Sequence, residues 1–167
     1  MNGFLRGLQQ PEYVHVLINP LPVYGLGIGL FAFIIAMLLR NRSAHIVALI
    51  VILVAAASAW LVQYFGDEAY DRVLSMTDEP GSAWLAAHEH RADKFIWSFY
   101  LLAAVAASAI ILPGKFPKTA MPLMILTLLL SMASLAAGCY IAYAGGKIRH
   151  REFRTEPPPP KPVERAD

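Results

Sequence analysis

The chain has 167 residues, of which 57% are hydrophobic, against the ~45–50% that is usual in soluble domains. All 14 basic and 12 acidic residues lie outside four apolar windows, at about residues 20–39, 44–65, 95–112 and 120–144. The net charge of +2 comes without an aromatic-interleaved basic patch, which argues against nucleic-acid binding. Continuous apolar runs without period-two alternation argue against a membrane β-barrel.

The first window, residues 20–39, is long enough to cross a bilayer as a helix, because 20 residues at ~1.5 Å each cover the ~30 Å hydrocarbon core. Residues 1–19 lack a compact apolar region followed by a small-residue cleavage site, so we expect an interfacial segment and not a signal peptide. Gly25 and Gly29 lie four apart, and this spacing predicts a face where another helix packs closely.

The second window predicts a helix that ends at Gly66. A polar connection over residues 67–94 follows, in which residues 67–74 predict a short amphipathic helix lying on the membrane surface. Thr77 to Ser82 has the composition of a turn.

The third and fourth windows are joined by a short turn, which predicts antiparallel neighbours. Ser134 and Gly138 repeat the small-residue spacing in the fourth window and predict a second packing face. Residues 147–167 are basic and then proline-rich, a composition that predicts a disordered tail.

The predicted fold is therefore all-α: an antiparallel four-helix transmembrane bundle with a short amphipathic surface helix between the second and third helices. It divides into an interfacial segment (1–19), a membrane domain (20–146) and a tail (147–167). Four crossings place both termini on one side. Arg40 and Arg42 after the first helix favour a periplasmic location for the termini in a bacterial inner membrane, whereas the basic residues after the fourth helix oppose it.

Four of the five histidines fall at the same end of such a bundle: His15, His88, His90 and His150. Histidines and carboxylates that converge at one end of a helix bundle can hold haem b or a divalent metal. The alternative is that they are ordinary interface histidines, since His88 and His90 point to nearly opposite sides of a helix and no HExxH motif is present.

Two short segments carry a resemblance. Residues 19–24 (NPLPVY) resemble the HP-x-x-VH start of the first helix in a family of bacterial four-helix inner-membrane proteins of unknown function, and residues 144–153 (AGGKIRHREF) are similar to the GG-x-IRH-x-E ending of its relatives. The resemblance covers most of residues 15–154 and implies the same fold. Asn19, Tyr24 and Tyr143 stand where that family has histidines, so of the implied ligands only His150 carries over.

Two functions are compatible with these observations. The absence of charge inside the windows and the small-residue faces favour a non-catalytic membrane subunit or assembly partner, which would contact the bilayer and another membrane protein or a second copy of itself. The histidine end favours a redox-linked protein that binds haem b or a divalent metal. Neither hypothesis requires the chain to be an enzyme.

Overall fold

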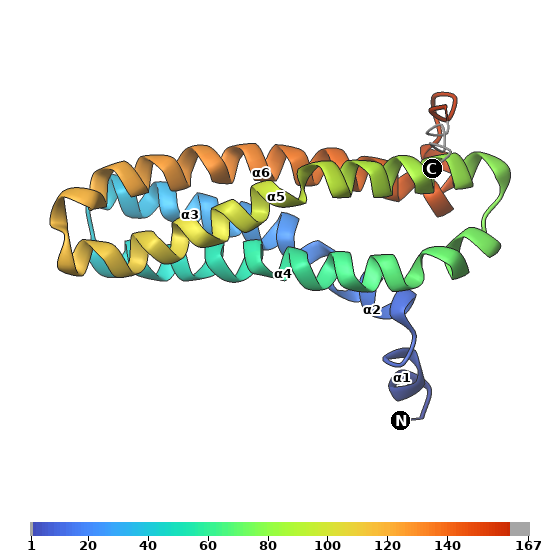
Figure 1. The fold of residues 1–167 in the computed structure, drawn as a ribbon, viewed down its shortest axis with the longest axis horizontal. Helices are drawn as coiled ribbons and strands as arrows, with labels where there is room; N and C mark the ends of the chain where they lie inside the picture. The colour runs from blue at the N-terminus through green and yellow to red at the C-terminus, as the bar shows by residue number, and fades with distance from the viewer. Residues whose placement is uncertain (1, 161–167) are drawn as a thin grey trace, which may run out of the picture.

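Four long helical rods run along the whole molecule, and rods that follow one another in the chain are antiparallel (Figure 1). The computed structural model describes residues 2–160, and each rod is long and apolar enough to cross a membrane. The predicted four-helix bundle is therefore confirmed, and the chain has the character of a small multi-pass membrane protein. The rods are Pro11–Leu39, Arg42–Ser75 (α4), Glu79–Lys115 (α5) and Pro117–Arg149.

The first and last rods are composite. The first joins α2 (Pro11–Ile18), a π-helical turn η1 (Leu21–Gly25) and α3 (Leu26–Leu39). Pro20 and Pro22 have no N–H to donate, which disrupts the regular α-helical bonding pattern at this turn.

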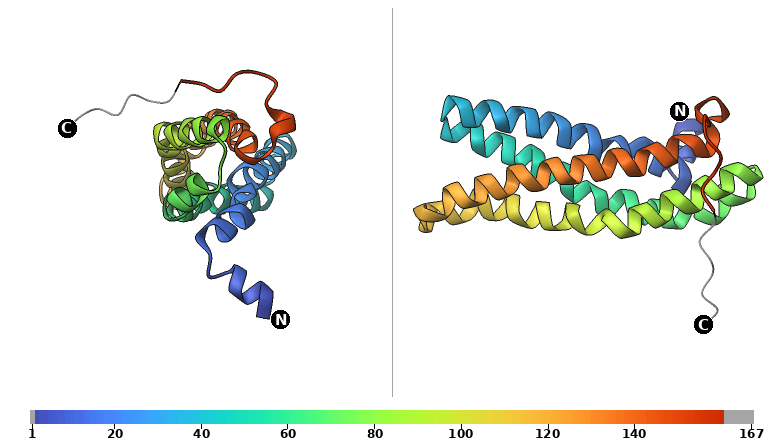
Figure 2. Two further views of the ribbon diagram at one scale, coloured as in Figure 1. Left: turned by 90° about the vertical axis from the view of Figure 1, so that its right-hand side faces the viewer. Right: turned by 90° about the horizontal axis from the view of Figure 1, so that it is seen from above.

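The last rod begins with the 3₁₀ turn η2 (Pro117–Thr119) and continues as α6 (Ala120–Arg149). Two short helices, α1 (Asn2–Gly7) and η3 (Arg151–Phe153), flank the bundle. Figure 2 shows α1 projecting away from the bundle and the segment after α6 crossing its end.

The surface helix predicted at residues 67–74 is not a separate element, because α4 continues through Gly66 as far as Ser75. The inner face of α4 stays buried beyond the apolar window, where Ala69 is only 4% exposed. Packing against the rest of the bundle therefore keeps the helix continuous. The break comes instead at residues 76–78, where the Asp78 side chain accepts a hydrogen bond from Gly81 N at 3.0 Å and starts α5. The bundle therefore extends about three turns beyond its apolar windows at this end.

The predicted boundary at residue 146 also differs from the structure, in which α6 ends at Arg149 and η3 follows. The Arg154 guanidinium donates to the carbonyls of Lys147 at 2.7 Å and Ile148 at 2.6 Å, so it caps the end of α6. Residues 161–167 of the predicted disordered tail lie outside the described residues.

The bundle core depends on small residues at helix crossings. A Cβ on Gly29 would lie 2.9 Å from Ile52 Cγ1, and one on Gly25 would lie 3.1 Å from Ala55 Cβ, so α3 approaches α4 closely along this face. A Cβ on Gly138 would lie 3.0 Å from a methyl group of Val23, and Ser134 is fully buried. Many large apolar side chains instead point outward, as expected for helices that face lipid.

Candidate functional site

The candidate site lies at the polar end of the bundle, where α4, α5 and α6 extend past their apolar windows and α2 packs against α4. Two of the four candidate histidines meet there. His15 comes from α2 and His88 from α5, and the centroids of their rings are 6.3 Å apart with the ring planes at 88°. The structure thus brings together side chains that are 73 positions apart in the sequence.

His15 is held against α4. Its Nδ1 lies 2.9 Å from the carbonyl oxygen of Val62, so this nitrogen carries the proton and donates it. Gly66 follows one helical turn later, and a Cβ on Gly66 would lie 3.0 Å from His15 Cε1. The glycine therefore provides the space in which the imidazole lies against the helix.

His88 is held against α6 in the same way. Its Nδ1 lies 3.0 Å from the carbonyl oxygen of Ile141, and a Cβ on Gly145, one turn later, would lie 3.0 Å from His88 Cε1. Each half of the bundle therefore repeats one arrangement: a histidine on the first helix, and on the second helix a carbonyl acceptor followed by a glycine.

This arrangement prepares both imidazoles to act as ligands. A histidine that donates from Nδ1 to a carbonyl keeps the lone pair on Nε2, which is how proteins orient imidazole toward a metal. Within the described part of the chain, the hydrogen bonds of both rings involve Nδ1 alone.

The ring separation also has the size expected for shared ligation. A metal–nitrogen bond of about 2.0 Å plus about 1.1 Å from nitrogen to ring centre puts two imidazoles on opposite sides of one ion about 6.2 Å apart. The observed separation of the two ring centroids, 6.3 Å, is compatible with this distance.

The other two predicted ligands are elsewhere. His90 is exposed, because two residues along a helix rotate a side chain by about 200° from the direction of His88. His150 is also exposed; its Nδ1 lies 2.9 Å from a Glu152 carboxyl oxygen and its ring stacks on Phe153. The four-histidine cluster is therefore reduced to a pair.

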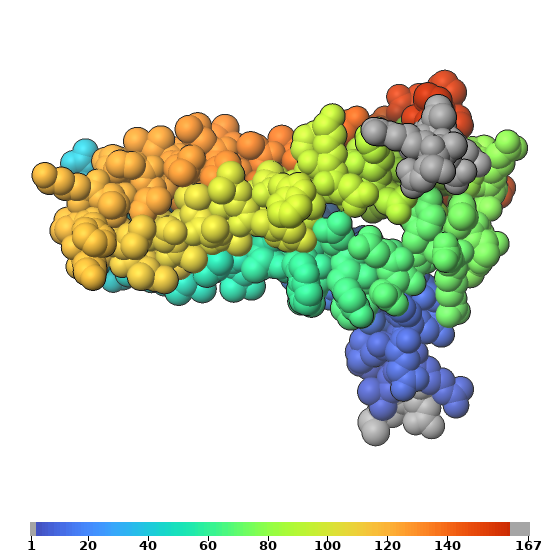
Figure 3. Space-filling view, in the orientation of Figure 1, coloured from blue at the N-terminus to red at the C-terminus, as the bar shows by residue number. Residues whose placement is uncertain are grey.

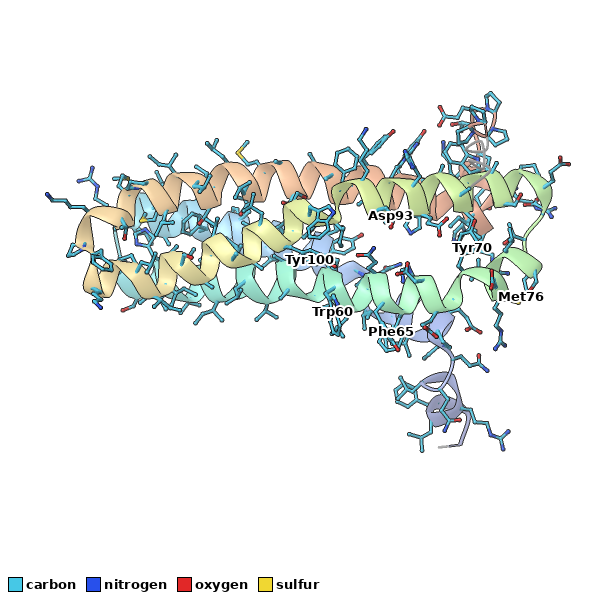
Figure 4. The ribbon with its side chains drawn as sticks, viewed as in Figure 1. Trp60, Phe65, Tyr70, Met76, Asp93 and Tyr100 are labelled. Atoms are coloured by element: carbon cyan, nitrogen blue, oxygen red, sulfur yellow. The ribbon has the colours of Figure 1, made fainter. Side chains whose placement is uncertain are left out.

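Polar side chains of α4 and α5 surround this end of the bundle. Tyr100 donates to Gln63 Oε1 at 3.1 Å, and Gln63 Nε2 donates to Asp93 at 3.2 Å. Figure 3 shows an opening between α4 and α5 here, and Figure 4 places Tyr70 and Asp93 beside it. Among residues 2–160, no three side chains from His, Cys, Asp and Glu are placed to hold one metal ion.

An ion-pair clamp closes the same end of the molecule. Arg154 lies 2.9 Å and Arg151 3.1 Å from the Asp78 carboxylate, and Lys147 lies 2.6 Å from Glu156. The hydrogen bond from Arg154 lowers the pKa of Asp78 to about 2, and the Gly81 N–H and the charges of both arginines act in the same direction. The segment after α6 is thereby tied to the turn between α4 and α5.

Sequence reasoning found the two histidines but missed what orients them. The sequence does not show that the backbone carbonyls of Val62 and Ile141 accept these hydrogen bonds, because every residue has a backbone carbonyl. Gly66 suggested a helix end, yet it and Gly145 both lie inside helices, where glycine is unfavourable unless a neighbouring side chain needs the space.

No protein-family model, curated protein or solved structure matches this chain. The fold and the composition define its class as a small multi-pass helical membrane protein.

Proposed function

We propose that His15 and His88 of this membrane protein would hold a haem b, and that the protein takes part in electron transfer at one membrane face. The observation that supports it is the pair of imidazoles whose ring centroids lie 6.3 Å apart, each ring donating from Nδ1 to a helix carbonyl. Haem b bound in this way would pass single electrons by cycling between ferric and ferrous iron.

The number of ligands favours haem over a single divalent ion. A structural zinc site takes four protein ligands and a catalytic one takes three, but only two are available within residues 2–160. A haem brings nitrogen ligands of its own, so two histidines would suffice to hold it.

The positions of the helices support the same choice. His15 belongs to the α2–α4 pair and His88 to the α5–α6 pair, so a haem held by both would draw one ligand from each pair.

The absorbance spectrum of the protein purified in detergent and reconstituted with haem b tests the proposal. We expect a Soret band that is shifted or lost in His15→Ala and in His88→Ala, because either change removes one of the two ligands that would hold the haem. His90→Ala and His150→Ala are the matched controls and should keep the band, since both side chains are exposed. A band that survives both ligand changes, or one that depends on His150, would contradict the assignment.

A second role, as a subunit or assembly partner, is supported by a different surface. An apolar groove of about 260 Å³ lies between η1 and α4 and includes Gly25, Ala55 and Ser58, small residues that admit a neighbouring helix. Val54 lines this groove and is 63% exposed, whereas Val47, at 62%, lies outside it. Val54→Phe should reduce recovery of a dimer or larger complex after cross-linking, and Val47→Phe should not.

The location of the protein is part of the proposal. The resemblance of residues 19–24 and 144–153 to the bacterial four-helix family supports a location in a bacterial inner membrane, and this location stays a prediction. We place both termini, and with them the histidine pair, in the periplasm. A periplasm-specific reporter fused after residue 160 should be active, and activity of a cytoplasm-specific reporter instead would reverse the orientation.

A further inference from the structure

The opposite end of the bundle contains a second pocket, which no part of the haem proposal uses. It has a volume of about 210 Å³ and lies between the start of α4, the end of α5 and the start of α6. Its lining combines the polar side chains Arg42 and His45 with apolar ones such as Leu49, Ile110 and Met124. A ligand that fits it must therefore have both a polar and an apolar part.

The charge around this pocket has one sign only. The two short turns at this end carry four basic side chains, all exposed: Arg40, Arg42, Lys115 and Lys118. The sequence has no acidic residue between Glu12 and Asp67 or between Asp93 and Glu152. Within residues 2–160, none of these four cations makes an ion pair. The surface around the pocket therefore attracts anions.

One polar atom in the pocket wall lacks a partner. Nε2 of His45 is fully buried and makes no hydrogen bond with any described residue, while its ring packs on Phe33 at 6.2 Å. A buried polar atom without a partner is uncommon and destabilises the folded protein. Turning the His45 ring so that this atom faces the pocket would let an oxygen atom of a bound group pair with it and remove that cost.

The depth of the pocket indicates where its ligand comes from. Arg42 lies just before the apolar window of α4 and Pro113 just after that of α5, which places the pocket at the boundary between hydrocarbon and headgroups. The start of α4 adds the partial positive charge of a helix N-terminus. A phospholipid presents phosphate and acyl chain together at this depth.

We propose that this pocket binds an anionic phospholipid from the leaflet on the side of the two short turns. The Arg42 guanidinium binds the phosphate, and His45 Nε2 forms a hydrogen bond with a headgroup or glycerol oxygen. The first part of an acyl chain packs against Leu49, Ile110 and Met124. The unpaired positive charge of the turns selects an anionic headgroup over a zwitterionic one.

Native mass spectrometry of the full chain in detergent, titrated with phosphatidylglycerol or phosphatidylcholine, tests this site. We expect phosphatidylglycerol to bind more tightly, and Arg42→Gln to weaken it about tenfold or more, the value of one charge-assisted hydrogen bond. Lys118→Gln is the matched control, because it removes the same charge at the same end from a residue outside the pocket. His45→Phe keeps an aromatic ring, removes Nε2 and should also weaken binding.

Three results would overturn the proposal. Equal binding of the two lipids would show that no anionic site exists. An equal effect of Arg42→Gln and Lys118→Gln would show diffuse attraction by the turns. Competition by millimolar inorganic phosphate alone would show a site for free anions and not for a lipid. Circular dichroism of each variant confirms that it is folded.

Discussion

The contact between α3 and α4 allows a quantitative test of the packing, because Gly27 and Gly29 lie two residues apart on the same helix in opposite environments. A Cβ on Gly29 would lie 2.9 Å from Ile52 Cγ1 and 3.2 Å from the Ile52 backbone nitrogen, whereas a Cβ on Gly27 would meet nothing within 4 Å. The Ile52 side chain can rotate, but its backbone nitrogen moves only if the helices separate.

Alanine in place of either glycine gains up to about 1 kcal/mol of helix propensity. At Gly29 the added methyl group also overpacks the crossing, which costs about 1–3 kcal/mol. The propensity gain cancels when the two variants are compared. We therefore expect Gly29→Ala to be about 1–3 kcal/mol less stable than Gly27→Ala.

Reversible unfolding in mixed detergent micelles, followed by tryptophan fluorescence, measures this difference in the free energy of unfolding. Gly27→Ala should be as stable as the parent chain or more so. Equal stability of the two variants, within about 0.5 kcal/mol, would mean that α3 does not approach α4 through Gly29.

Three further predictions concern the site, the clamp and the core. Gly145→Ala should displace the His88 ring by a few tenths of an ångström and lower haem retention several-fold, whereas Gly114→Ala, in open space, should leave it unchanged. The low pKa of Asp78 means that its ion pairs stabilise the clamp fully at pH values above the ordinary pKa of 3.8, and that this stabilisation is lost as the pH falls toward about 2. At that low pH, limited proteolysis should cut the chain after α6. The Asp78→Asn variant should be cut there at neutral pH too. Ser134→Ala should leave the free energy of unfolding unchanged or raise it by up to about 1 kcal/mol, because the buried Ser134 hydroxyl has no hydrogen-bond partner among the described residues. A decrease in the free energy of unfolding of more than about 1 kcal/mol would point to a hydrogen bond absent from this structure.

The helices could be predicted from the sequence because the signal is strong: four uncharged stretches of bilayer length leave few alternative folds. Their ends were harder to place. Gly66 and residues 67–74 have the local composition of a helix end followed by a separate helix, but burial of Ala69 against the rest of the bundle continues α4 without interruption. Tertiary packing therefore overrode local propensity at this point.

The histidine end was predicted from helix parity, which shows only that side chains share an end of the molecule. Which of them meet depends on helix rotation and on the space beside each ring. His15 and His88 reach each other because Gly66 and Gly145 leave room, while His90 and His150 point to solvent. No pattern in the sequence encodes the carbonyls that accept from Nδ1, so the orientation of the two rings required the structure.

The most direct test of the two-histidine site is the electron paramagnetic resonance spectrum of the oxidised, haem-reconstituted protein at low temperature. Two imidazole ligands on one haem give a low-spin ferric signal, and we expect that signal in the parent chain and its loss in His15→Ala and His88→Ala. A high-spin signal in the parent chain, or a low-spin signal that persists in both variants, would contradict the proposed ligation.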